Sequence, residues 1–345
     1  VLLPLKLGKY FERNGYKDVN EMDWYDEIFI NEIKQFKGGQ SNPTYMIATN
    51  QGDFVLRRQP PGKLLKSAHA VDREYRVITA LSQTDVPVPR TYGYCDDEDV
   101  VGTKFFLMDH VKGNIYWELI LPNLDEVARR DIYLSMNDTI SKLHNVNFEK
   151  INLGDYGKHE NYMQRQIYRW TKQYKDSETQ EIGEINELID WLPKNIPLEE
   201  ETSIVHGDFR LDNMIFDPET HQVKAILDWE LSTLGNPIAD FTYHMMSWRL
   251  PAAAKGLGML GSDLKSLNIP SEDEYSALYY KKTGRNKIEN WDFYMAYNIF
   301  RLAGIAQGIV GRVRDGTASS SEAKNYEAFV PILGKIGWDI VRGIK

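Results

Sequence analysis

The sequence HGDFRLDN at His206–Asn213, followed by ILDW at Ile226–Trp229, decides the fold prediction. Asp208, Asn213 and Asp228 place oxygen-bearing side chains next to short apolar runs, at Ser203–Val205, Met214–Phe216 and Val223–Leu227. Such runs are typical of buried β-strands, which would hold the polar side chains rigidly at strand ends. A surface turn is the alternative interpretation, because Gly, Asp and Asn are common in turns. The ordered trio favours a functional site over a turn.

The residue types of this trio match the needs of phosphoryl transfer from a nucleotide. That reaction needs one carboxylate that orients a hydroxyl and accepts its proton, and oxygen ligands that hold Mg²⁺ against the phosphates. Asp208 is predicted to be the catalytic carboxylate. Asn213 and Asp228 are predicted to be the metal ligands.

The same motifs carry a resemblance to known families. His206-Gly207-Asp208 with Asn213, then Asp228-Trp229, resembles the aminoglycoside phosphotransferase and choline kinase group. The longer string DWELSTLGNPIADF at Asp228–Phe241 resembles the phosphotransferase-like domain that some longer proteins carry beside an acyl-CoA dehydrogenase domain. The resemblance runs from about Ile28 to the C-terminal region.

This resemblance implies an α+β, protein kinase-like fold with two lobes. A small N-terminal β-sheet lobe with one helix would bind the nucleotide, and we place it at residues 1–111. A larger, mainly helical C-terminal lobe would carry the catalytic and substrate-binding residues, and we place it at residues 112–345. Helices are predicted in this lobe over residues 125–146, 160–176, 178–192, 237–248, 271–283, 290–313 and 319–342.

A Gly-rich turn joins the first two predicted strands, Ile28–Phe36 and Thr44–Ala48, into a hairpin. The residues predicted to contact the nucleotide phosphates in this turn are Gly38, Gly39, Ser41 and Asn42. Glycines let backbone N–H groups approach phosphates without obstruction by a side chain. Gly-Gly is also common in ordinary hairpin turns, so the turn alone leaves both interpretations open.

The next predicted strand, Phe54–Arg58, supplies a cation. Alternation puts Val55 and Arg57 on one face of the strand. By the resemblance, Val55 lines the adenine pocket and Arg57 points at the phosphates, where a protein kinase has lysine. Glu74, in a helix predicted over Ser67–Leu81, is expected to pair with Arg57. An exposed edge-strand Arg and a solvated helix Glu are the alternatives.

The resemblance also assigns roles to four residues outside these elements. The carbonyl of Asp109 and the N–H of Val111 would meet the adenine edge at the hinge between the lobes. Arg210 occupies the position where protein kinases often place a lysine, so we expect it to neutralise charge on the transferred phosphate; a solvated Arg fits the sequence equally well. Asp240 would brace the catalytic loop through backbone hydrogen bonds.

Two further features concern the predicted helices. Acidic residues open the helix over residues 125–146, which suits its positive N-terminal end. The candidate core residues of that helix are Val127, Tyr133, Leu134, Ile140 and Leu143.

Composition limits the class of protein. The 345 residues are 42% hydrophobic and 12% aromatic, as in a globular protein with a substantial core. A net charge of −9 without a Lys/Arg block argues against a nucleic-acid partner, and no apolar run reaches the roughly 18 residues of a membrane span. The single cysteine, Cys95, favours a reducing compartment, so we expect a cytoplasmic location. The absence of an initiator Met leaves open a removed targeting segment.

We therefore predict an enzyme that uses Mg²⁺ and ATP (or GTP) to phosphorylate a hydroxyl of a small metabolite. The narrower resemblance points to a hydroxyacyl-CoA. Asp228 is followed by Trp-Glu instead of Phe-Gly, and no Ala-Pro-Glu segment follows, which argues against a protein substrate. An aminoglycoside, choline or amino-sugar kinase is the alternative, and so is a non-catalytic nucleotide-binding protein of the same fold. The sequence leaves the oligomeric state open.

Overall fold

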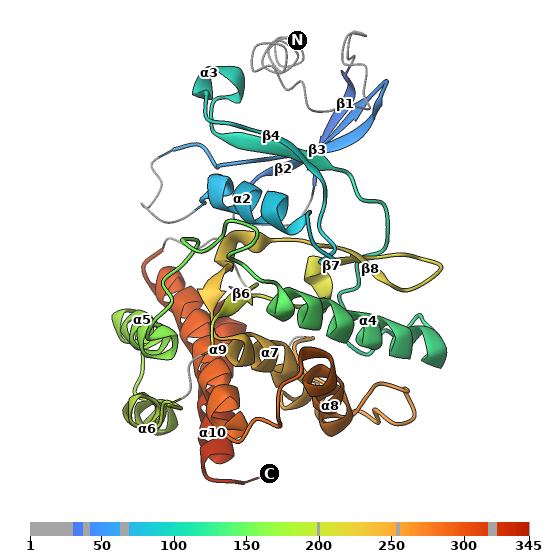
Figure 1. The fold of residues 1–345 in the computed structure, drawn as a ribbon. Helices are drawn as coiled ribbons and strands as arrows, with labels where there is room; N and C mark the ends of the chain where they lie inside the picture. Colours follow the sequence, from blue (N-terminus) through green and yellow to red (C-terminus); the bar gives the residue numbers. More distant parts are fainter. Residues whose placement is uncertain are drawn as a thin grey trace. The chain divides into compact units, whose positions relative to one another are not determined.

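The computed structural model describes residues 30–36, 42–62, 69–198, 201–252, 256–316 and 323–344. The chain forms two compact units (Figure 1). Of the described residues, the first contains those from Ile30 to Asn114 together with Lys224–Glu230, and the second contains Ile115–Val223 and those from Leu231 to Ile344. The segment Lys224–Glu230, which carries Asp228, groups with the first unit.

A five-stranded sheet forms the centre of the first unit, with strand order β1-β2-β3-β5-β4 and antiparallel neighbours throughout. Its strands are β1 (Ile30–Gln35), β2 (Thr44–Thr49), β3 (Gly52–Arg58), β4 (Thr91–Cys95) and β5 (Phe105–Asp109). The predicted hairpin is present, because β1 pairs with β2 in a register that puts Gln35 opposite Tyr45.

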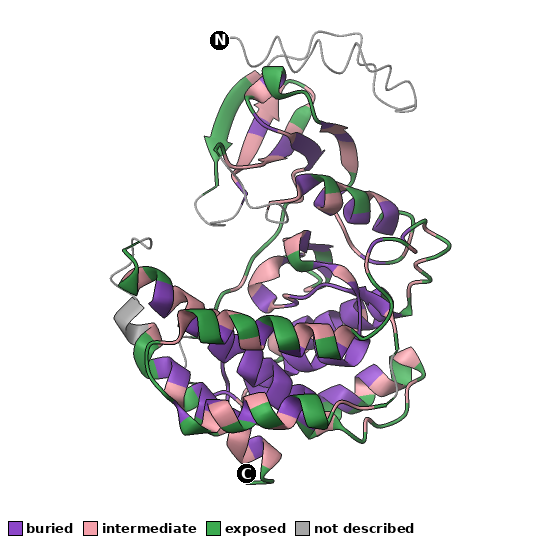
Figure 2. Ribbon diagram, turned by 90° about the vertical axis from the view of Figure 1, so that its left-hand side faces the viewer, coloured by how far each residue is buried: buried purple, intermediate pink, exposed green. Residues whose placement is uncertain are grey.

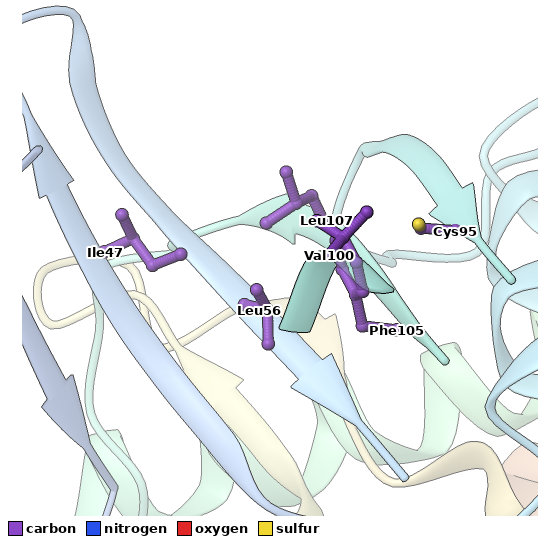
Figure 3. Close-up of a cluster of buried hydrophobic side chains, with 6 residues drawn as sticks. All are labelled: Ile47, Leu56, Cys95, Val100, Phe105 and Leu107. Carbon is purple, nitrogen blue, oxygen red and sulfur yellow. The ribbon is translucent and has the colours of Figure 1, made fainter. Parts of the chain in front are cut away.

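One face of this sheet is covered by the helix α2 (Val71–Leu81), which begins four residues after the predicted start. The Tyr75 ring of α2 lies 6.0 Å from the ring of Phe106 and 5.8 Å from that of Tyr94. The other face carries a buried apolar cluster (Figure 3) of Ile47, Leu56, Cys95, Val100, Phe105 and Leu107.

The alternation along β3 follows from these two faces. Leu56 belongs to the apolar cluster, whereas Arg57 reaches Glu74 of α2 on the opposite face. Val100 reaches the cluster from α3 (Glu98–Val101), a short helix that was not predicted. Asp97 caps α3 at its start, and Gly102, at φ 84°, ends it. Both are ordinary helix signals.

The second unit is mainly helical, as predicted. Its helices are α4 (Glu126–Asn145), α5 (Tyr162–Ser177), α6 (Gly183–Trp191), α7 (Pro237–Met245), α8 (Glu272–Thr283), α9 (Trp291–Arg314) and α10 (Ala323–Val341). Its short strands are β6 (Ser203–Val205), β7 (Met214–Phe216) and β9 (Thr233–Gly235), while β8 (Val223–Ile226) spans the boundary of the units. Among the described residues, no helix has the length and hydropathy that a bilayer crossing requires.

Helix α9 packs against α5, α7 and α10. Buried residues gather where the helices of this unit face one another (Figure 2). The predicted core of α4 is confirmed for Tyr133, Ile140 and Leu143, whereas Leu134 is half-buried.

The prediction was wrong for Val127, which is 62% exposed. The buried stripe of α4 begins one residue later and continues at four-residue spacing through Ala128, Ile132 and Met136. Val127 lies beside this stripe in the first helical turn.

Helix α7 is buried along its whole length, and this has consequences for its histidine. The ring of His244 lies 5.4 Å from that of Phe209 and 5.7 Å from that of Trp248, and its Nε2 lies 2.9 Å from the Tyr275 hydroxyl. Burial lowers the pKa of His244 to about 4, so the imidazole is neutral in the folded protein.

This buried histidine predicts acid sensitivity. A histidine whose folded pKa is depressed stabilises the protein above its unfolded pKa, near 6.5, and that contribution is lost as the pH falls toward 4. Between pH 7 and pH 5 we expect His244 to account for a loss of roughly 2 kcal/mol in unfolding free energy. Urea unfolding of the wild type and His244→Gln at both pH values measures this, and an equal pH dependence in the two proteins would contradict it.

Candidate active site

The loop that carries Asp208 starts where β6 ends and needs glycine at its second residue. Gly207 has φ 81°, a left-handed conformation, and a Cβ atom there would lie only 2.8 Å from the carbonyl oxygen of Leu231. Glycine meets both demands, since it lacks the Cβ atom. The turn leaves the Asp208 side chain 24% exposed.

Asp240 of α7 holds this loop in place. Its two carboxylate oxygens accept hydrogen bonds from the backbone N–H groups of His206 and Gly207, each 2.8 Å long. The Nε2 of His144 lies 3.2 Å from the same carboxylate, and the Nδ1 of His144 lies 2.7 Å from the hydroxyl of Tyr279. The predicted bracing of the loop by Asp240 is confirmed.

The hydrogen-bond donors around the buried Asp240 carboxylate determine its charge state. Burial alone would raise the pKa of Asp240, but the hydrogen bond from His144 and the backbone bond from His206 outweigh it and hold the pKa low. Burial lowers the pKa of His144, so its ring is neutral. Asp240 is therefore an anion whose charge is met by hydrogen-bond donors.

Both oxygens of the Asp208 carboxylate are engaged within the second unit. Oδ1 accepts a 2.6 Å hydrogen bond from the hydroxyl of Tyr243, and Oδ2 accepts a 3.0 Å bond from Nδ2 of Asn213. Nδ2 of Asn213 also donates to the Asp208 backbone carbonyl at 2.9 Å. The amide nitrogen of Asn213 is thus directed at Asp208, which points its amide oxygen away from that carboxylate.

Arg210 is tied to the same loop. Its Nε donates to Oδ1 of Asp212 at 3.0 Å, its Nη2 pairs with the other carboxylate oxygen, and its Nε lies 3.9 Å from Oδ1 of Asp208. Burial would lower the pKa of Arg210, but the bond to Asp212 and the charge of Asp208 raise it. Arg210 is therefore a fixed cation beside the Asp208 carboxylate, and the side chain does not extend freely into solvent.

In the first unit, Arg57 bridges two acids. Its Nε lies 2.8 Å from Oε2 of Glu74, and its Nη2 lies 2.7 Å from Oδ1 of Asp228. The side chains of Arg57 and Glu74 are 12% and 2% exposed, which excludes an exposed edge-strand Arg and a solvated Glu. The expected Arg57–Glu74 pair is present. The pair with Asp228 was not anticipated, because no local signal connects residues so distant in sequence.

The residues around Glu74 fix its position. Asn42 is buried and its Nδ2 donates to Oε1 of Glu74 at 2.7 Å, while its Oδ1 lies 3.1 Å from Nδ1 of His69. Both polar atoms of the Asn42 side chain are thus hydrogen-bonded within the unit. The predicted phosphate contact of Asn42 is a contact of its backbone N–H group. The predicted contacts of Gly38, Gly39 and Ser41 lie outside the described residues.

Burial and the Arg57 charge oppose each other at Glu74. Burial is the larger effect and raises the pKa of Glu74 to about 7, although Arg57 lowers it. For Arg57, burial would lower the pKa, but the charges of Glu74 and Asp228 raise it. The arginine therefore keeps its charge and presents a cation between two acidic side chains.

Asp228 adopts an uncommon backbone conformation. Its φ of 62° is left-handed, which costs on the order of 1–3 kcal/mol for a residue other than glycine. Strained residues of this kind cluster at functional sites. The Asp228 side chain is 34% exposed, so its carboxylate combines partial access to solvent with a fixed bond to Arg57.

The predicted adenine contacts lie at the end of the sheet. Val55 is buried on β3, and Asp109 is the last residue of β5, opposite Phe54. The Tyr92 hydroxyl donates to the Asp109 carboxylate at 2.5 Å, and burial together with this bond raises the pKa of Tyr92 to about 12. The contacts of the Asp109 carbonyl and the Val111 N–H with adenine remain predictions.

The donor chemistry of Asn213 and Asp228 suits magnesium, which prefers oxygen ligands. Within the described ranges, no group of three or more His, Cys, Asp or Glu side chains could hold a metal ion by itself. Magnesium in nucleotide sites does not require such a group, because it takes one or two protein oxygens together with phosphate oxygens and water.

Three residues that contact the Asp208 loop were not predicted from the sequence: Asp212, which binds Arg210, Tyr243, which binds Asp208, and Arg301, which binds the carbonyl of Gly207. Tyr243 follows Asp240 by three residues in α7, and this helical spacing puts both on one face, so the signal was available. Arg301 is a buried arginine in the apolar helix α9. Its contacts with the loop depend on tertiary packing that periodicity does not report.

Comparison with known proteins fits this arrangement. The sequence profile of the phosphotransferase enzyme family matches residues 32–275. Acyl-CoA dehydrogenase family member 10 of Mus musculus is 43% identical over 309 residues, which are 89% of this chain and 29% of that protein. The chain spans less than half the length of such curated relatives.

Solved structures with a similar fold include two that are informative here. A Ralstonia eutropha JMP134 protein with the provisional name aminoglycoside phosphotransferase is 44% identical and has a TM-score of 0.88, with 99% of this chain and 98% of that chain covered. Choline kinase of Cryptosporidium parvum Iowa II is 14% identical, with a TM-score of 0.63 and coverages of 98% and 96%. The predicted protein kinase-like α+β fold is thereby confirmed. The chain belongs to the phosphotransferase enzyme family.

Proposed function

We propose that this chain transfers the γ-phosphoryl group of magnesium-bound ATP (or GTP) to a hydroxyl of a small metabolite. The observation that supports this most is the Asp208 carboxylate, held by Tyr243 and Asn213 on a loop that Asp240 braces. Such a carboxylate is fixed in place yet partly exposed. Membership of the phosphotransferase family supports the same reaction class.

In the proposed reaction, Asp208 orients the acceptor hydroxyl and accepts its proton. The hydroxyl oxygen attacks the γ-phosphorus in line, the bond to the β-phosphate oxygen breaks, and the nucleoside diphosphate leaves. No phosphorylated form of the enzyme is needed. A positioned proton acceptor typically contributes ~10²–10⁴-fold to the rate. Arg210, a fixed cation beside Asp208, would neutralise charge on the transferred phosphoryl group.

Several residues, distant from one another in the sequence, would hold the nucleotide. We propose Asn213 and Asp228 as the magnesium ligands, on the strength of their oxygen donors and of the family. When bound, magnesium neutralises charge on the phosphate oxygens. Arg57, kept charged by its acidic partners, would add a further positive charge for the phosphates. Backbone N–H groups of the turn that contains Gly38, Gly39, Ser41 and Asn42 would meet the phosphates. Val55, the Asp109 carbonyl and the Val111 N–H would meet adenine.

The acceptor we favour is a hydroxyacyl-CoA or a similar hydroxy acid derivative. The curated relatives are named as acyl-CoA dehydrogenase family members, and their matching part is this phosphotransferase region. An aminoglycoside or choline-like acceptor is the second candidate, supported by the names of the similar structures. The single cysteine of the sequence supports a reducing, cytoplasmic setting as part of the proposal.

The role of Asp208 predicts a selective loss of turnover. In a screen of hydroxyacyl-CoAs, aminoglycosides and choline with magnesium–ATP, Asp208→Asn should turn over at least ~10²-fold more slowly than the wild type, because the proton acceptor is gone. Asp217→Asn is the matched control, since Asp217 caps the turn after β7 and should leave turnover intact. Phosphorylated product is quantified by mass spectrometry. Equal turnover by Asp208→Asn and the wild type would remove the mechanism.

The metal ligands predict that nucleotide binding depends on magnesium. At 100 times its Kd, magnesium–ATP should stabilise the wild type by about 2.7 kcal/mol, and ATP with EDTA should give much less. Asn213→Ala and Asp228→Ala should each lose the metal-dependent part of the thermal shift. Asp138→Asn removes an exposed partner of Lys142 and should keep it. A wild-type shift that is the same with and without magnesium would instead favour a non-catalytic nucleotide-binding protein.

A further inference from the structure

A buried cation contacts the Asp208 loop. Arg301 of α9 is 7% exposed, and its Nη2 donates to the carbonyl of Gly207 at 2.5 Å. Its guanidinium carbon lies 4.4 Å from the centroid of the Tyr243 ring and 5.4 Å from that of Trp170. Within the described part of the chain, Arg301 forms no ion pair with a carboxylate, and its Nε has no hydrogen-bond partner. Buried charges are normally paired, so this placement calls for an explanation.

Tyr243 connects this cation to the catalytic carboxylate. The face of its ring lies against Arg301, and its hydroxyl donates to Oδ1 of Asp208 at 2.6 Å. Burial raises the pKa of Tyr243, and the nearby charge of Asp208 raises it further, so the phenol stays protonated. A protonated phenol beside a carboxylate acts as the donor.

We propose that Tyr243, backed by Arg301, is a positioning residue that fixes the Asp208 carboxylate for phosphoryl transfer. The terminal torsion of an aspartate is broad, so the carboxylate can rotate unless its oxygens are held. Tyr243 holds Oδ1 while Asn213 holds Oδ2, and together they remove this rotation. This inference rests on the proposed function of the site.

Arg301 contributes in two ways. It stacks on the ring that holds Asp208, and it binds the carbonyl of Gly207, the residue directly before Asp208. One side chain therefore fixes both the backbone and the side-chain anchor of the carboxylate. A cation over an aromatic face is attracted to the ring, which offsets part of the cost of burying the charge.

Tyr243→Phe tests the inference, because it removes only the hydroxyl and keeps the ring against Arg301. The probe reaction is hydrolysis of magnesium–ATP, followed by phosphate release. A water oxygen attacks the γ-phosphorus, ADP leaves, and the water proton passes to Asp208 and then to solvent. We expect kcat to fall by roughly 10- to 100-fold, as for a misplaced catalytic group, with KM for magnesium–ATP within about twofold of the wild type.

Tyr133→Phe is the matched control. Tyr133 is also buried, but its hydroxyl donates to the carbonyl of Leu119 at 2.7 Å, away from the site. Tyr133→Phe should leave both kcat and KM unchanged. The positioning role is overturned if Tyr243→Phe keeps the wild-type kcat, if it raises only KM, or if it lowers kcat no more than Tyr133→Phe does.

A double-mutant cycle separates this inference from the proposed function. In the Asp208→Asn background, adding Tyr243→Phe should change the residual kcat by less than about twofold, because the group to be positioned is already lost. If Tyr243→Phe lowers kcat as much in the Asp208→Asn background as in the wild type, Tyr243 acts elsewhere and the inference is overturned. A wild type that phosphorylates no acceptor of the screen and hydrolyses magnesium–ATP no faster than Asp208→Asn would overturn the proposed function, and this inference with it. A slow Asp208→Asn beside a fully active Tyr243→Phe would overturn the inference alone.

Discussion

The carboxylate of Asp240 is the constraint on which the site depends. It accepts the backbone N–H groups of His206 and Gly207 and thereby fixes the turn that ends β6. A buried carboxylate is costly unless donors surround it, and here two N–H groups and a neutral His144 supply them. The left-handed Gly207 and the position of Asp208 follow from this anchor.

The first unit uses charge in a different way. Arg57 is paired with two acids, so its positive charge is retained in a largely buried position. Asn42 completes the arrangement by donating to Glu74. Each unit thus presents one fixed acid with partial access to solvent, Asp208 in the second and Asp228 in the first. For the proposed chemistry, fixed charges are preferable to mobile ones because they need no reorganisation during reaction.

The sequence predicted what local patterns and motifs can encode. The alternation of β3, the Arg57–Glu74 pair and the bracing role of Asp240 are all present. Val127 was wrongly predicted to be buried. The buried stripe of α4 can begin at residue 127 or at residue 128 without a change in the apolar pattern later in the helix. The Arg57–Asp228 and Arg301–Tyr243 contacts could not be predicted, since they join segments that only tertiary packing brings together.

We propose that oxygen atoms of Asn213 and Asp228 would hold a metal-bound triphosphate for reaction at Asp208. A crystal structure with Mn²⁺ and a non-hydrolysable ATP analogue tests it most directly, because the anomalous signal of manganese locates the ion independently of the protein phases. We predict a manganese peak within coordination distance of both side-chain oxygens, with the γ-phosphate next to Asp208. A nucleotide whose metal contacts neither Asn213 nor Asp228, or one bound away from Asp208, would contradict the account.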